Sequence, residues 1–128
     1  MNDREKFILT IRNDETLSTT EFLESLHQCK DDIDFVIDRI LAISDHLMSS
    51  EQWDKLKEII DNFPVNDYDN AIIMALPCST WLGAKPNNIL VARENYYLRA
   101  KEEFEKRGKS EEQIQNLFKV LRILPNGQ

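Results

Sequence analysis

Apolar residues recur at helical spacing along most of this chain. Spacings of three and four predict helices over residues 19–28, 31–47, 49–63, 66–82, 86–107 and 110–124, and we expect no β-sheet. Over residues 31–47 the expected buried stripe is Ile33, Val36, Ile37, Ile40 and Leu41. Phe35 and Ala42 lie on the opposite side, so this helix is expected to be contacted on two sides.

Capping signals mark the predicted helix ends. Three serines are each followed three residues later by Glu or Gln, which is the pattern of a capping box: Ser18 with Glu21, Ser49 with Gln52, and Ser110 with Gln113. Gly108 follows two basic residues and is expected to stop the helix over 86–107 in a left-handed conformation. The pattern therefore indicates short connections between helices.

The stretch Ala71–Leu76 is apolar on every side, which predicts a helix at the centre of the molecule. Pro77 is expected to kink this helix, which then continues to Leu82. The fold class that follows is all-α, with about six helices packed as consecutive antiparallel neighbours. Either a globular helical array or a short stack of helical hairpins satisfies this pattern.

The length of 128 residues suits a single helical domain over 1–128. Residues 1–16 are ambiguous, because the apolar run at 7–11 suits either an extended segment or a helical turn; we treat them as a loosely packed N-terminal segment. The longest apolar run is far shorter than the roughly 20 residues of a membrane span, and the charged start is unlike a signal peptide. A cytoplasmic protein without membrane contact is expected.

Charge is distributed unevenly around a net value of −7: residues 1–64 hold fifteen acidic and seven basic side chains. Four of the acids form a row on one predicted helix face, namely Asp31, Asp34, Asp38 and Asp45. Such a row is either a solvated face or an acidic docking face for a protein. A metal site is not expected there or at His27, Cys29 and His46, because the ligand spacing of calcium and zinc sites is missing.

Arg93 falls inside the apolar stripe of the helix over 86–107, beside Tyr96 and Tyr97. A charge at such a position needs a partner, so Arg93 forms either a structural ion pair or a contact to an anionic ligand. The preceding loop adds Lys85, near a helix N-terminus, and Trp81, a residue type enriched at interfaces. We take these five residues as candidate ligand or partner contacts.

Motifs for a nucleophile, a metal or a phosphate-binding loop are missing from the sequence, so we expect no cofactor and favour a protein that is not an enzyme. The leading hypothesis is a small protein-binding module, acting as an adaptor, regulator, inhibitor or complex subunit. One alternative is an enzyme or ligand-binding protein with an interhelical pocket around Arg93, Tyr96 and Tyr97. Weak nucleic-acid contact is a further alternative, through the basic residues Arg99, Lys101, Lys106, Arg107, Lys109, Lys119 and Arg122.

Overall fold

The computed structural model describes residues 2–81 and 86–120, with side chains described except at 78–81 and 118–120. Within these residues the chain contains helices and no strand, which confirms the all-α prediction. The elements in order are α1 (Asp3–Thr16), α2 (Thr19–Gln28), α3 (Ile33–Ser49), α4 (Trp53–Asn62), the 3-10 turn η1 (Val65–Asp67), α5 (Asn70–Trp81), α6 (Asn87–Lys106) and α7 (Glu111–Val120).

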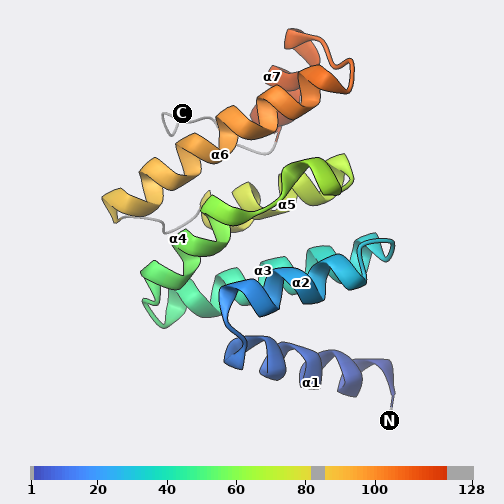
Figure 1. The fold of residues 1–128 in the computed structure, drawn as a ribbon, viewed down its shortest axis with the longest axis vertical. Helices are drawn as coiled ribbons and strands as arrows, with labels where there is room; N and C mark the ends of the chain where they lie inside the picture. The colour runs from blue at the N-terminus through green and yellow to red at the C-terminus, as the bar shows by residue number, and fades with distance from the viewer. Residues whose placement is uncertain (1, 82–85, 121–128) are drawn as a thin grey trace.

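The helices form a short stack in which the chain runs back and forth, so that consecutive helices from α2 onward are antiparallel (Figure 1). Packing is most extensive between α3 and α5 and between α4 and α6. Two layers result: α2, α4 and α6 lie toward the viewer in Figure 1, and α3, α5 and α7 lie behind them. Among the described residues, no helix has the length and hydropathy needed to cross a membrane.

Two of the three predicted capping boxes form. Ser18 and Ser110 each accept a hydrogen bond from the backbone N–H three residues later, and the Glu21 and Gln113 side chains accept in return. These bonds from Ser18 hold the pKa of Glu21 below its usual value. Gly108 has a φ of 84° and ends α6, as predicted.

The box predicted at Ser49 is wrong, because Ser49 is still the last residue of α3. The chain turns at Glu51, whose φ is 57°, and Gln52 takes the N-cap position of α4 without a side-chain cap bond. Ser50 instead bonds back to the His46 carbonyl at 2.6 Å. α3 therefore runs two residues further than its predicted end, and α4 begins later than predicted.

The buried face of α3 is also rotated from the predicted one. Val36 and Ile40 are buried as expected, but Ile33 is 36% exposed and Leu41 is 38% exposed. Arg39 occupies the buried stripe instead, beside Ile43 and Leu47. Ile33 and Leu41 were therefore wrongly assigned to the core, because α5 packs against a neighbouring side of the helix.

α5 is the central helix, as predicted, and packs against both α3 and α6. Residues 72–76 are buried, whereas Ala71 is exposed at the start of the helix. Pro77 lies inside α5, which continues to Trp81; the predicted end at Leu82 lies outside the described residues. The Tyr96 hydroxyl of α6 donates to the Ile73 carbonyl of α5 at 2.5 Å and joins the two helices.

Residues 3–16, left ambiguous by the sequence, form α1, whose N-terminus carries an unpredicted capping box between Asn2 and Glu5. α1 packs on the side of α3 that carries Phe35, whose ring meets Phe7 edge-on at 6.3 Å. This confirms that α3 is contacted on two sides. Among the described residues of α1 only Asp14 is fully buried, so the helix is an addition to the stack.

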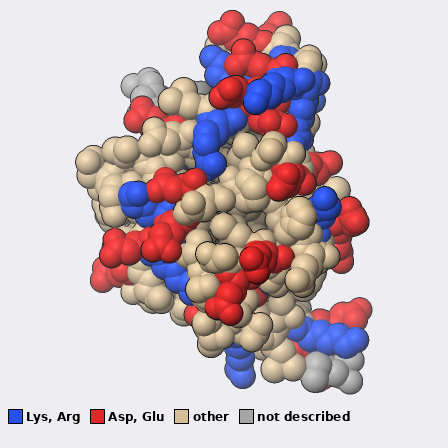
Figure 2. Space-filling model, in the orientation of Figure 1, with Lys and Arg blue, Asp and Glu red and all other residues tan. Residues whose placement is uncertain are grey.

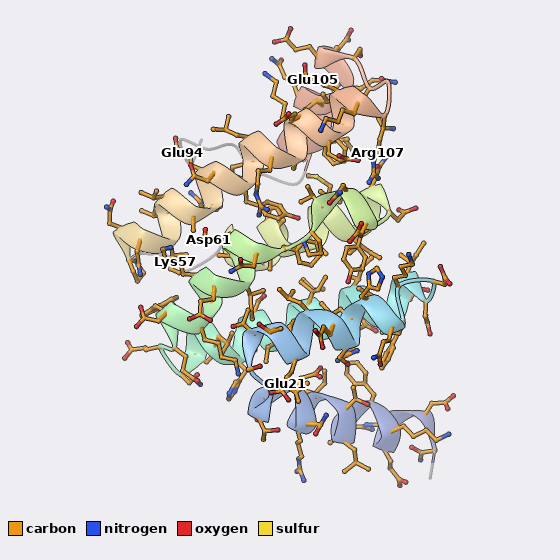
Figure 3. The ribbon with its side chains drawn as sticks, viewed as in Figure 1. Glu21, Lys57, Asp61, Glu94, Glu105 and Arg107 are labelled. Atoms are coloured by element: carbon orange, nitrogen blue, oxygen red, sulfur yellow. The ribbon has the colours of Figure 1, made fainter. Side chains whose placement is uncertain are left out.

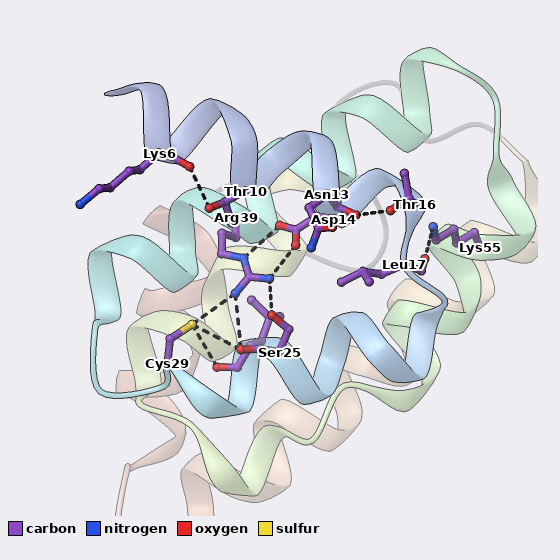
Figure 4. A network of polar contacts seen from close by, with 11 residues as sticks. Lys6, Thr10, Asn13, Asp14, Thr16, Leu17, Ser25, Cys29, Arg39 and Lys55 are labelled. Carbon is purple, nitrogen blue, oxygen red and sulfur yellow. Dashed lines mark hydrogen bonds and ion pairs between the residues drawn. The ribbon is translucent and has the colours of Figure 1, made fainter. Parts of the chain in front are cut away.

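Asp14 binds Arg39 through two parallel hydrogen bonds of 2.6 and 2.9 Å (Figure 4). The guanidinium also donates to Ser25 Oγ at 2.8 Å and to Cys29 Sγ at 3.3 Å. Residues of α1, α3, α2 and the α2 C-cap thus meet at one buried arginine. The network therefore attaches α1 to the stack through charged hydrogen bonds, although α1 has no buried apolar face among its described residues.

Candidate docking groove

A groove of about 590 Å³ opens between α3, α5 and α7, the helices of the second layer. Among the described residues, its mostly apolar walls are formed by Ile37, Leu41, Ala71, Met74, Ala75 and Leu117, and Asp69 and Asn70 add polar groups at the start of α5. Met74 and Ala75 are buried at its floor, whereas Leu41 is partly exposed at its edge. We call this feature the docking groove; each of the three helices contributes a different wall.

An acidic rim borders the docking groove along α3. Asp34, Asp38 and Asp45 are exposed, and each lies three or four residues from Ile37 or Leu41. Residues at these spacings are neighbours on a helix surface, so the carboxylates stand beside the apolar wall. Asp69, which precedes α5, lines the groove itself and completes the rim.

Three of the four acids predicted to share a face therefore do so. Asp31 does not, because α3 begins at Ile33 and Asp32 is its N-cap, accepting from the Phe35 N–H at 3.3 Å. Asp31 is exposed in the turn before the helix. The prediction placed the start of this helix two residues too early.

One end of the docking groove is held by Arg107 at the C-terminus of α6. Arg107 donates to Asn70 Oδ1 at 2.6 Å and to the Tyr68 carbonyl at 2.7 Å, and Figure 3 shows it extending toward the start of α5. Its charge is offset by Glu103, whose carboxylate lies 3.0 Å from the guanidinium. Arg107 therefore holds Asn70, which lines the groove, and Glu103 balances its charge.

On the face drawn in Figure 2, the basic side chains at the α6–α7 end of the molecule are interspersed with acidic ones. Arg99 donates to the Ile60 and Phe63 carbonyls at 2.7 and 3.0 Å and so caps the C-terminal end of α4. Arg107 is bonded to Asn70 and the Tyr68 carbonyl and is paired with Glu103. The Lys119 side chain and Arg122 lie outside the described part of the chain.

The predicted cluster of Arg93, Tyr96 and Tyr97 lies on the buried side of α6, and all three side chains are almost fully buried. The Tyr96 hydroxyl is occupied by the Ile73 carbonyl, and burial raises the pKa of Tyr96 far above its usual value. Tyr96 therefore acts in helix packing. Arg93 and Tyr97 share this buried face of α6.

Two other candidates cannot be placed as contacts. Trp81 is the last residue of α5, with its side chain outside the described set, and Lys85 lies outside the described residues. Within the described parts of the chain, His, Cys, Asp and Glu side chains do not cluster in a way that could hold a metal ion.

The sequence pattern pointed to the acidic half of this site and missed the apolar half. Ile37 and Leu41 were assigned to the core, and the place of Leu117 in the lining depends on how α7 folds back. A sequence signal did exist: an apolar stripe containing Val36, Ile40, Ile43 and Leu47 leaves Ile37 and Leu41 on a separate side of the helix.

No protein-family model matches this chain, and comparisons with curated proteins and with solved structures find no match.

Proposed function

We propose that this chain is a small cytoplasmic protein-binding module that receives its partner in the docking groove. The observation that carries the proposal is an exposed apolar groove crossing three helices with acidic side chains along its edge. Apolar surface bordered by polar residues is characteristic of interaction sites. Stacked helical hairpins also present extended surfaces of this kind.

Site-specific photo-crosslinking in cells tests this proposal. A photoreactive phenylalanine analogue replaces Leu41 at the groove edge, and the matched control replaces Leu98, which is 65% exposed on α6 in the other layer. A partner that docks in the groove is expected to crosslink from position 41 and not from position 98.

Binding of the crosslinked protein is then measured with both components purified. Leu41→Glu is expected to weaken that binding by at least about tenfold, because it places a charge in the apolar contact, whereas Leu98→Glu leaves it unchanged. Circular dichroism checks that both variants are folded. Identical crosslinked proteins from both positions, or equal binding by Leu41→Glu and the unchanged chain, would refute docking in this groove.

A further inference from the structure

We infer that the occupant of the docking groove is a basic amphipathic α-helix of another protein. This inference rests on the proposed function and specifies the chemistry of the partner. It has three supports: the groove walls offer few backbone hydrogen-bonding groups, the exposed charged side chains along the α3 edge are acidic, and this edge has the length of a short helix.

The groove walls favour a helical occupant. They are mainly the side chains of three helices whose backbone groups bond within the helices. At the first turn of α5, the Ala71 N–H donates to Asp69 Oδ1 at 2.9 Å, so the groove offers few partners for a backbone N–H or C=O. An extended peptide would lose hydration of these groups without replacement bonds. A helix satisfies its backbone internally and presents an apolar stripe, as in other helix-in-groove complexes.

The rim selects the charge of that helix. Asp34, Asp38 and Asp45 lie along one edge and Asp69 lies at the groove. Their combined field attracts Lys and Arg, whose aliphatic stems can cover the apolar edge while their charged ends reach the carboxylates. The same field repels a fatty-acid carboxylate, an anionic phospholipid headgroup or an acidic helix.

The length of the rim sets the length of the occupant. Asp34 and Asp45 are eleven residues apart on a continuous helix, which corresponds to about 16 Å, or three helical turns. A ligand helix with apolar residues at positions i, i+3, i+4 and i+7 and Lys or Arg beside them covers this span. Its docking is expected to weaken as salt screens the exposed carboxylates.

The experiment measures binding of fluorescent helical peptides of about 15 residues to the full chain by anisotropy. One peptide carries a leucine stripe flanked by lysines, a second has glutamate in place of every lysine, and a third has the first composition in scrambled order. We expect the lysine peptide to bind at least about tenfold more tightly than the other two at low salt, with a smaller difference at high salt.

A charge-matched pair of variants tests the rim. The triple variant Asp34→Asn/Asp38→Asn/Asp45→Asn is expected to weaken binding of the lysine peptide by about tenfold and to reduce its salt dependence. The control Glu24→Gln/Glu94→Gln/Glu105→Gln removes the same charge from exposed positions of α2 and α6 and is expected to have little effect. Equal binding of the lysine and glutamate peptides, or equal loss in both variants, overturns the inference.

Other occupants give other results. A concentration-dependent dimer that Leu41→Glu abolishes would assign the groove to a second copy of this chain and overturn the inference. Tighter peptide binding by Leu121→Glu/Leu124→Glu would assign it to the chain's own C-terminal residues, with the same consequence. If a crosslinked partner binds through Leu41 but no basic peptide binds, the inference fails while the proposed docking function stands.

Discussion

Asp14 and Arg39 illustrate at the residue scale how polar groups replace an apolar helix face. Both side chains are buried and joined by two hydrogen bonds. Burial lowers the pKa of Arg39, but its bonds and charge interaction with Asp14 outweigh this effect and hold the pKa above its usual value. The guanidinium is therefore charged at neutral pH, and because it is buried it needs its carboxylate partner.

We predict that Asp14→Ala destabilises the protein by about 3 kcal/mol, because it leaves the charge of Arg39 buried without its partner. The double variant Asp14→Leu/Arg39→Met is expected to recover most of this loss, since it removes both charges and keeps apolar volume. Urea unfolding followed by circular dichroism measures both effects. The control Asp61→Ala breaks the partly exposed pair with Lys57 and is expected to cost much less (Figure 3). A double variant no more stable than Asp14→Ala would contradict this account.

Two buried arginines differ in whether their burial can be predicted from the sequence. Arg93 lies inside a regular apolar stripe, and it is buried in α6 together with Tyr96 and Tyr97, its predicted neighbours in that stripe. The burial of Arg39 was not predicted, because the predicted buried stripe of its helix was centred on Ile33, Ile37 and Leu41. Amphipathic periodicity identifies a buried charge only when one face of the helix is buried, whereas α3 is contacted by α1 as well as α5.

At the scale of elements, local signals predicted most helices, and they failed where two helices are joined tightly. The signals at Ser18, Gly108 and Ser110 are satisfied by their own neighbours and so are visible in sequence. The connection after α3 depends on the left-handed conformation of Glu51. The sequence there has no glycine or asparagine to predict that conformation. The docking groove was missed for a related reason, since Leu117 of α7 joins Ala71 of α5 in its lining only through the tertiary arrangement of the helices.

The difference between the formed and the unformed capping box gives a direct test. Ser110→Ala is expected to destabilise the protein by about 1 kcal/mol, because the N-terminal amides of α7 lose their cap. Ser49→Ala is expected to be neutral, since Ser49 is exposed in the last turn of α3 and its side chain caps no helix. Urea midpoints compare the two variants under one condition. A loss at Ser49 equal to that at Ser110 would mean that a box forms at the start of α4 after all.

At the scale of the whole molecule, one hydrophobic cluster connects α2 to α7 and leaves α1 outside. Its buried residues come from every described helix of the stack, including Phe22 of α2 and Ile114 of α7. α1 contributes none of them and exposes Ile8 and Leu9. A continuous core of this size favours cooperative unfolding, whereas long repeat arrays lose cooperativity between distant repeats.

We therefore predict that native-state hydrogen exchange separates two units. Protected amides of α3, α5 and α6 are expected to exchange through one common opening with the free energy of global unfolding, because their side chains share the cluster. Amides of α1 are expected to exchange through a smaller opening, lower by more than about 1 kcal/mol, and Asp14→Ala should lower it further. The docking groove is expected to persist through that opening, since its described lining residues belong to α3, α5 and α7 and to the residue before α5. Exchange of the α1 amides with the same opening free energy as those of α5 would contradict this prediction. It would mean that the polar network around Arg39 holds α1 as strongly as the apolar core holds the other helices.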